Sequence, residues 1–484
     1  MSGIKKALWS LAFLCAFPSP AAAEALTLER FLNEIRENHP FFVKEALSSD
    51  IEKKKQEKFL GDEDWLVRSS PFFSHQQSAY QNAFTLKSVD QAGLNASLGR
   101  TFWKTGGRLS FSYDYTGTNR SVDDIVIPLP GATINIPSGS GMFYENGFAM
   151  TYSHPLMKNK DGFLSKLDYD LQAYNISATD IVIKENQENF LLSAAILFID
   201  WALLKEQRRI LEKRLELAKE ELERTKRKRK QNMVDEVDVI RARDAVLNAR
   251  QNVLSAEAGM RAKGAEIGTI AQLKDVEGLE ASHDLYSLET APSVDEAVDL
   301  LKANSRVLKV FDVRLGQINL SAKGAEEREK PQLGLNLSGG LTSGAWQYGD
   351  SLGYNKPQYS ASLNFSYPLG NRTARADLAK TRVEKDRIEE GKENMSLKLE
   401  SGLRNLLTHI KELEKVLAVN IEQIEVAKEK TGEELKRYNQ GRIELTFVID
   451  SRDREQNIQL IYAQNAALYN KLVLRYKALT DSLL

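Results

Sequence analysis

The chain has 484 residues, of which 66 are basic and 67 acidic, so it is nearly neutral. This balance argues against binding to a nucleic-acid backbone, which needs a large basic excess, even though five consecutive basic residues run from Lys226 to Lys230. The only cysteine, Cys15, lies close to the start of the chain, so no thiol or disulfide is expected in a mature, exported protein.

The first residues have the pattern of a secretory signal peptide. Lys5 and Lys6 precede an apolar run over 7–17, and Ala21-Ala22-Ala23 forms a cleavage site of the Ala-x-Ala type. The mature chain is therefore expected to begin at Glu24. No later stretch offers 18 uncharged apolar residues, so the sequence predicts no transmembrane helix.

The mature chain contains the same succession of predicted elements twice, and we call these the first and the second copy. Each copy opens with a short amphipathic helix, over 26–40 and over 293–307. A strand-like region follows, then a Pro-Leu pair at Pro155 or Pro368, and then a long helical run. An internal two-fold sequence repeat is therefore predicted. The predicted parts are a signal peptide over 1–23, a first structural repeat over 24–290 and a second structural repeat over 291–484.

The strand-like regions alternate apolar side chains with small polar ones, which is the period of a β-strand. In the second copy, over about 331–369, Tyr359, Leu363 and Phe365 alternate with serine and asparagine. A soluble half-buried sheet has the same period. The export signal and the Ser, Asn and Gly faces favour an outer-membrane barrel, whose apolar face meets lipid. The barrel must be shared between chains, because two to four strands per copy close no lumen and lipid tolerates no open edge.

The first copy is longer than the second between its opening helix and its Pro-Leu pair, by 53 residues. The surplus contains a Lys-Thr-Gly-Gly turn at 104–107 and a loop rich in proline and glycine at 122–142. We interpret the region over about 99–145 as an elaborated extracellular region with an enlarged loop and room for extra strands, whose number the sequence leaves open. A long loop without strands is the alternative.

The runs over 164–230 and 372–438 contain no proline and are rich in Glu, Lys, Arg, Leu and Ala. As continuous helices they would each be about 100 Å long, at 1.5 Å per residue. Apolar residues recur with a period of 3.5, for example from Leu211 and from Leu403, which predicts coiled-coil packing. The pattern thus predicts a long antiparallel helical hairpin in each copy. The two turns are expected near Asn232 and Gly441.

Taken together, the opening helix, the duplication, the Pro-Leu pairs and the hairpin tips resemble the TolC-like outer-membrane efflux protein family. The second tip reads RYNQGRIELTFVID, with Tyr438, Gly441 and Asp450 in the family pattern. The resemblance implies a mixed α and β fold, in which three chains share an outer-membrane β-barrel. Four strands per chain would close a 12-stranded barrel, continued by a periplasmic α-helical barrel of coiled-coil hairpins. It also implies a homotrimer that works with a periplasmic adaptor and an inner-membrane pump in efflux or type I secretion.

The family's gate lies at the helical tips, and the residues here depart from its pattern in two places. Asn232 stands at the place of the first-copy glycine, and Phe447 stands where many members have an acidic residue. We expect Asp238 and Asp450 to form the constriction, with Arg241 and Arg442 as partners. The expected residues for adaptor docking are Lys226, Arg227, Lys228, Arg229, Lys230, Asn232, Tyr438 and Gly441.

Two other classes of function compete with this one. An enzyme is disfavoured, because the five histidines are scattered without metal-ligand spacing and no nucleophile or phosphate-binding motif appears. Neither cofactor nor metal is expected. A periplasmic coiled-coil adaptor would carry one hairpin in a compact domain, whereas this chain alternates two hairpins with strands. The location expected is therefore the cell outer membrane, with an extension into the periplasm.

Overall fold

The computed structural model describes residues 25–77, 86–122, 124–136, 140–273, 280–289 and 292–483. The predicted signal peptide and its cleavage site lie outside these residues. The chain divides into two compact units. The first comprises Met1–Glu45, Lys184–Ser305 and Ser396–Leu484, and the second comprises Ala46–Ile183 and Arg306–Met395.

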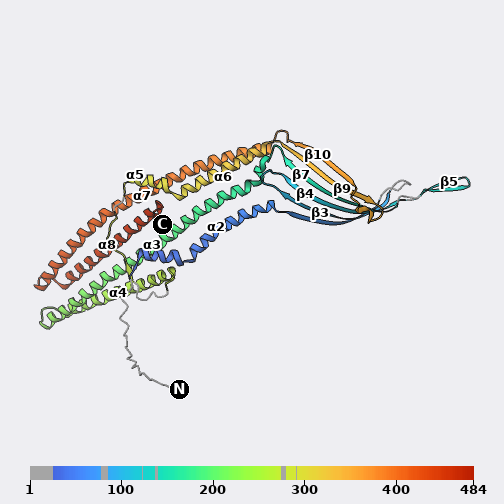
Figure 1. Cartoon of the computed structure of the whole chain (residues 1–484). Coiled ribbons are helices and arrows are strands. Elements are labelled where there is room, and N and C mark those ends of the chain that lie inside the picture. The colour runs from blue at the N-terminus through green and yellow to red at the C-terminus, as the bar shows by residue number, and fades with distance from the viewer. Residues whose placement is uncertain are drawn as a thin grey trace, which may run out of the picture. The chain divides into compact units, whose positions relative to one another are not determined.

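The second unit contains a six-stranded sheet with the order β10-β9-β7-β4-β3-β2 (Figure 1). Every neighbouring pair in it is antiparallel. The strands are β2 (Leu66–Gln77), β3 (Leu86–Thr101), β4 (Arg108–Val122), β7 (Gly141–Pro155), β9 (Gln332–Ala345) and β10 (Lys356–Ser366). The resemblance implied four strands per chain, and this expectation is wrong. Two more strands form because the surplus of the first copy folds mostly as sheet.

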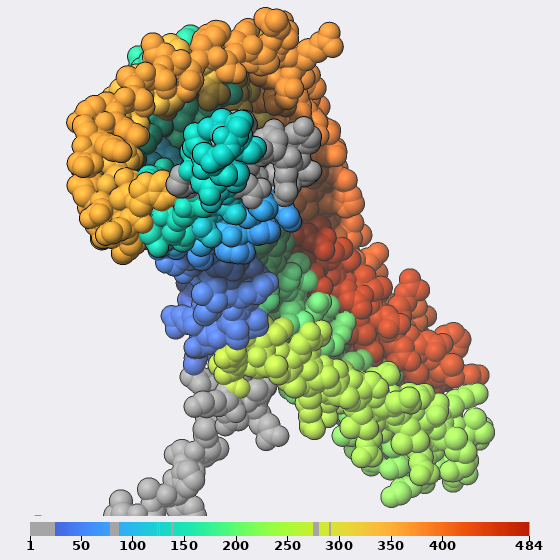
Figure 2. All heavy atoms as spheres, turned by 90° about the vertical axis from the view of Figure 1, so that its right-hand side faces the viewer, coloured from blue at the N-terminus to red at the C-terminus, as the bar shows by residue number. Residues whose placement is uncertain are grey.

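The sheet has one apolar and one polar face, as the alternation predicted. Phe148 and Met150 of β7 and Leu341 of β9 share the apolar face and are exposed in the single chain. Ala149 and Gly340, a paired couple, lie on the opposite face. Figure 2 shows the strands curving around a hollow.

The surplus region contains strands, so the alternative of a long loop without strands is wrong. A second antiparallel ribbon, β5 (Ile125–Leu129) with β6 (Ala132–Ile136), is inserted between β4 and β7. The glycine turn at 104–107, expected in an extracellular region, lies instead at the end of the sheet where the helices begin. There the ring of Trp103 lies 5.3 Å from that of Tyr169, in the first turns of α3. A Cβ on Gly162 (φ 69°) would lie 1.5 Å from the carbonyl oxygen of Trp103, so this joint requires glycine.

Eight α-helices are found in the part of the chain that the structure describes, and two of them are very long. They are α1 (Leu28–Asn38), α2 (Pro40–Phe59), α3 (Phe163–Lys230), α4 (Glu236–Ile270), α5 (Val294–Asn304), α6 (Arg306–Glu329), α7 (Arg372–Asn439) and α8 (Leu445–Leu479). Both α3 and α7 have 68 residues, and both α4 and α8 have 35. The expected long helices and their turns are thus present.

The first unit has its core where α1 and α5 pack against the long helices. Phe31 of α1 stacks on Phe198 of α3, with ring centroids 5.4 Å apart. The fully buried Leu403 and Tyr469 bring α7 and α8 into the same cluster. The short strands β1 (Ala25–Thr27) and β8 (Glu280–Ser282) pair in parallel beside it. The opening helices therefore fasten the hairpins together.

One helix among the described residues, α3 with the turn before it, contains an 18-residue window apolar enough to cross a membrane. Of that window, 44% is buried inside the protein. Leu191 and Phe198 of this helix belong to the core of the first unit. Core helices of soluble proteins have the same composition, so the window is weak support for a membrane span.

Candidate functional site at the helical tips

Both long hairpins turn through a residue in the left-handed backbone region. Asn232 lies between α3 and α4 with φ 54°, and Gly441 lies between α7 and α8 with φ 72°. In each turn the following residue donates its backbone N–H to a carbonyl five residues earlier, at 2.9 and 3.0 Å. Asparagine enters this conformation more readily than most side chains, so the first tip closes without a glycine.

Tyr438, at the end of α7, joins the two hairpins. Its side chain is 3% exposed and packs with Ala242 of α4 and with Leu445 and Val448 of α8. Its hydroxyl lies 3.3 Å from that of Thr225 on α3. Burial raises the pKa of Tyr438, so its hydroxyl is protonated at neutral pH. The tyrosine therefore connects helices of both copies by packing and by a hydrogen bond.

Lys228 makes a second connection between the tips. Its Nζ lies 3.6 Å from the centroid of the Tyr438 ring and donates a hydrogen bond of 2.8 Å to the backbone carbonyl of Tyr438. Burial, together with the charge of Arg224, lowers the pKa of Lys228. The middle residue of the basic run thus faces the second hairpin.

The rest of the basic run is divided among several environments. Lys226 pairs with Glu223 at 2.7 Å, and Arg229 pairs with Glu236, the first residue of α4, at 3.3 Å. Arg227 and Lys230 are exposed. The run is therefore a mixed tip surface with a few exposed cations and not one continuous basic patch.

The four expected gate residues do not form one cluster within a chain. Arg241 pairs with Asp238 of its own helix at 3.4 Å and reaches Glu444, at the start of α8, at 4.0 Å. Asp450 and Arg442 are exposed, and their side chains form no ion pair with another described residue. Glu444, which sequence reasoning did not select, is thus the acidic group that meets Arg241 across the hairpins.

Further from the turns, charged residues lie between α3 and α8, where Arg214 and Glu221 are buried, Arg452 is half-buried and Asp453 is exposed. We call Arg214, Glu221, Arg452 and Asp453 the inter-hairpin charge cluster. The Arg214 Nε donates to Asp453 at 2.9 Å, and the Glu221 carboxylate lies 3.7 Å from Arg214 and 3.5 Å from Arg452. Burial raises the pKa of Glu221, although Arg214 and Arg452 act in the opposite direction. Neither carboxylate oxygen of Glu221 has a hydrogen-bond partner among the described residues.

The charge cluster occupies the stripe where a coiled coil places apolar residues. Leu211, Arg214, Ala218, Glu221 and Thr225 are buried at spacings of three and four along α3. Sequence reasoning missed it because charged residues are normally read as exposed. The apolar pattern that starts at Leu211 placed Leu215 and Leu222 in this stripe, whereas Arg214 and Glu221, each one residue earlier, are the buried ones.

Beside the cluster, a polar groove of about 490 Å³ lies between α3, α4 and α8. Arg214, Arg241 and Asp453 line it, together with several asparagines of α4. Its wall is charged and amide-rich, and one of its members, Arg241, is also the residue that reaches Glu444. Arg241 thus contributes both to the groove and to the contact between the two tips.

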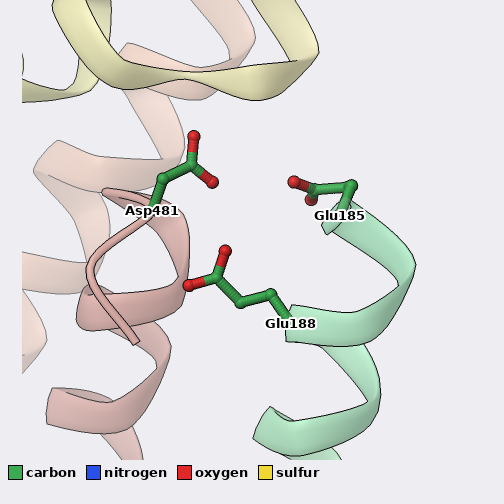
Figure 3. Close-up of side chains that lie close together, drawn as sticks. All are labelled: Glu185, Glu188 and Asp481. Carbon is green, nitrogen blue, oxygen red and sulfur yellow. The ribbon is translucent and has the colours of Figure 1, made fainter. Parts of the chain in front are cut away.

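Three carboxylates meet at another place in the first unit. Glu185 and Glu188 of α3 and Asp481, after α8, point toward one another, with oxygen atoms within 4.8 Å (Figure 3). Glu188 accepts a hydrogen bond of 3.0 Å from the backbone N–H of Leu483. Each of the three has an interaction partner in the protein. The hydrogen bond between Glu188 and Leu483 attaches the C-terminal turn to α3.

No protein-family description and no curated protein matches the sequence. Solved structures do match. A structure of CusC, described in terms of transmembrane channel formation, has a TM-score of 0.66 at 10% identity, covering 93% of this chain and 91% of that one. The outer membrane protein VceC of Vibrio cholerae has a TM-score of 0.64 at 10% identity, covering 94% and 95%.

The open state of the MtrE outer membrane channel of Neisseria gonorrhoeae is also similar, with a TM-score of 0.58 at 15% identity. This match covers 94% of this chain and 89% of that one. Nearly the whole chain is therefore matched, the sheet as well as the hairpins. The chain has the fold of the TolC-like outer-membrane channels, as its sequence led us to expect.

Proposed function

We propose that the protein is a passive exit duct of the outer membrane, part of a tripartite efflux pump or a type I secretion system. The observation that carries this proposal is the two-faced sheet. Phe148, Met150 and Leu341 expose 46%, 46% and 42% of their surface on one face. Contiguous apolar surface of this kind marks an interface, and in a barrel it is the face that meets lipid.

Aromatic side chains at the end of the sheet away from the helices support the membrane assignment. The ring of Tyr348 lies 5.8 Å from that of Tyr115 and 5.7 Å from that of Tyr144. Tyrosines gather at the boundary between lipid and water, where an apolar ring and a polar hydroxyl are both satisfied. The predicted signal peptide, cleaved before Glu24, would export the chain to this membrane.

A homotrimer built from an internally repeated chain is the assembly that we propose. The equal lengths of α3 and α7, and of α4 and α8, support two structural repeats, over 24–290 and 291–484. Three chains would place twelve helical stretches around one axis. These would form the periplasmic tunnel, and the sheets would form the barrel.

The tips would act as the gate, closed when the hairpins are held together. Within one chain, Lys228 and Thr225 hold Tyr438, and Arg241 reaches Glu444. Asp450 and Arg442 are exposed, which leaves them available to neighbouring chains or to the pore. A ring of three Asp450 carboxylates, together with three from Asp238, would favour cations at the constriction.

A periplasmic adaptor would dock on the tips through the exposed members of the basic run. Arg227 and Lys230 are exposed at the end of α3, next to the turn at Asn232. The corresponding end of α7 carries Lys436 and Arg437 in its last turn. The first tip is the more basic of the two, so it would suit an acidic adaptor surface.

The proposal is tested by purifying the protein from membrane fractions and recording its conductance in planar bilayers. A heat-modifiable trimer in the outer-membrane fraction that conducts ions is expected, whereas a soluble periplasmic product would overturn the proposal. For the gate, Asp450→Ala and Asp238→Ala should raise conductance and weaken cation preference. The control is Glu429→Ala, an exposed charge on α7 away from the tip.

A periplasmic adaptor without a channel is the second candidate, supported by the coiled-coil hairpins alone. It does not account for a six-stranded sheet with an exposed apolar face. The three solved structures compared above, which are described as channels or as an outer membrane protein, also favour the duct over an adaptor or an enzyme.

A further inference from the structure

The two edges of the six-stranded sheet are open in the single chain. β10 forms one edge and pairs only with β9, and β2 forms the other and pairs only with β3. All residues of β10 and nearly all of β2 are exposed. An open edge presents unpaired N–H and C=O groups, which in water are a template for pairing with another chain and in lipid have no hydrogen-bond partner. Both edges therefore need a partner.

The direction of the strands allows each edge to pair with the other edge of a second copy. All five neighbouring pairs in the sheet are antiparallel. Because the number of strands is even, β10 runs opposite to β2. A second copy can therefore add its β2 beside β10 and continue the antiparallel pattern without interruption.

The faces of the two edge strands also agree. On β10, Leu363 and Phe365 lie on the apolar face, exposed by 66% and 68%, and Ser362 lies on the polar face. On β2, Phe73 lies on the apolar face, exposed by 73%, and Ser70 lies on the polar face opposite Asn95 of β3. If these two strands pair, the apolar face and the polar face of the sheet both continue into the second copy. A two-faced sheet requires a pairing register that keeps each face intact.

Each open edge contains one proline, Pro71 on β2 and Pro357 on β10. Proline is confined to edge strands because it has no N–H to donate. Each proline removes one donor from the edge. The other residues of β2 and β10 keep their donors, so most of the ladder can form.

From these observations we infer that β10 of each copy pairs with β2 of the next and that three copies close a barrel of eighteen strands. The inference rests on the trimer proposed above. Twelve strands would require each chain to leave two of its six outside the ring. Yet β3 is paired along its length with both β2 and β4, so neither edge hairpin is loosely attached.

The consequence is a wider exit than a twelve-stranded barrel provides. Barrel diameter grows roughly linearly with the number of strands, so eighteen strands give a barrel about half as wide again, and barrels of 16–18 strands leave an aqueous channel. The polar face carries Ser112 and Asn95, among other small polar residues. The lumen would therefore pass broad, hydrated, polar cargo without binding it through a dedicated site.

Cross-linking of introduced cysteines tests the pairing. The only cysteine, Cys15, lies in the predicted signal peptide, so introduced thiols are the only ones in the mature chain. Ser70→Cys on β2 is combined in turn with Ser360→Cys, Ser362→Cys and Asn364→Cys on β10, three positions that cover alternative registers. Oxidation with copper phenanthroline in native membranes should give covalent dimers and trimers for at least one pair.

A matched control replaces Ser70→Cys by Ser112→Cys, which lies on the same face but on the inner strand β4. No cross-link is expected with Ser112→Cys, and a strong one there would overturn the inference because β4 would then be an edge. Light scattering of the purified protein is done first. A monomer would overturn the proposed function, whereas a trimer with no β2 to β10 cross-link would overturn only the pairing.

Electron cryo-microscopy of the unmodified trimer in lipid discs provides a measurement that does not depend on the variants. A ring of eighteen strands is the expected result. A ring of twelve would overturn the inference even if the cysteine variants failed to assemble.

Discussion

The Nζ of Lys228 lies over the ring of Tyr438 and donates to the carbonyl of the same residue, so one lysine of the first hairpin is bound twice by one tyrosine of the second. A hydrogen bond from a charged donor contributes about 1.5–3 kcal/mol, and a cation over an aromatic ring about 0.5–2 kcal/mol. Replacing Lys228→Met should therefore weaken the tip contact by about 2 kcal/mol. That shifts the proposed gate roughly thirtyfold toward the open state.

Single-channel recording measures this shift as a higher open probability. Lys226→Met is the matched control, since Lys226 is exposed and pairs with Glu223 on its own helix. Equal behaviour of the two variants would show that Lys228 does not hold the tips together.

Glu221 should make the stability of the hairpins depend on pH. Burial raises its pKa above the ordinary value of 4.5, so the folded state binds this proton more tightly than the unfolded state. The contribution is fully present below about pH 4.5 and is lost as pH rises through the folded pKa. Thermal unfolding followed by circular dichroism should show the wild-type midpoint falling across this window relative to Glu221→Gln. The slope is at most about 1.4 kcal/mol per pH unit.

Glu223→Gln serves as the comparison for that experiment. Its hydrogen bond to Lys226 lowers the pKa of Glu223, so its contribution has the opposite sign and fades as pH falls. Wild-type and Glu221→Gln curves that stay parallel from pH 4.5 to 7 would contradict the assignment to Glu221.

Gly162→Ala should prevent the sheet from joining α3 correctly. The added Cβ would collide with the backbone of Trp103, and the positive φ disfavours any side chain. A loss of about 3 kcal/mol or more is expected, measured as loss of the heat-modifiable trimer. Gly402→Ala is the control, because a Cβ there meets nothing within 4 Å in the middle of α7. That variant should assemble normally.

Two neighbouring positions of β7 test which face meets lipid. Met150 lies on the apolar face and Thr151 on the polar face, where it donates to Ser338 of β9 at 3.2 Å. An arginine facing lipid near the membrane centre costs about 2–4 kcal/mol. Met150→Arg should therefore reduce the amount of assembled trimer in the outer membrane, while Thr151→Arg should mainly alter conductance. The reverse pattern would show that the faces have been assigned the wrong way round.

The regular spacing of apolar residues allowed much of the fold to be predicted from the sequence. The long helices begin after the Pro-Leu pairs and end at the turns expected near Asn232 and Gly441, and the alternation through Tyr359, Leu363 and Phe365 indicated the two faces of the sheet. The strand β2 was missed, because Pro71 and the adjacent Phe72 and Phe73 interrupt its alternation. The four strands per chain that the resemblance implied are wrong, whereas the range of two to four strands per copy agrees with the sheet, which has four strands from the first copy and two from the second.

The tip contacts were harder to foresee. Asp238 and Arg241 were chosen for their charge, and they do pair, but within one helix. Lys228 was read as one of five equivalent cations, because the sequence does not tell which member of a basic run faces a neighbour. Its direction depends on the packing of α7 against α3, which the local sequence does not determine.

In the proposed channel, the inserted strands would have a consequence for how the width of the pore can change. The chain enters β3 and leaves β4 at the same end of the sheet. These two strands therefore add to the circumference, while β2 still connects to α2 and β7 to α3. Width on the membrane side can thus vary in steps of two strands per chain while the number of helices stays fixed. In the proposed channel, the width of the strand barrel and that of the helical tunnel would therefore be set independently by one chain.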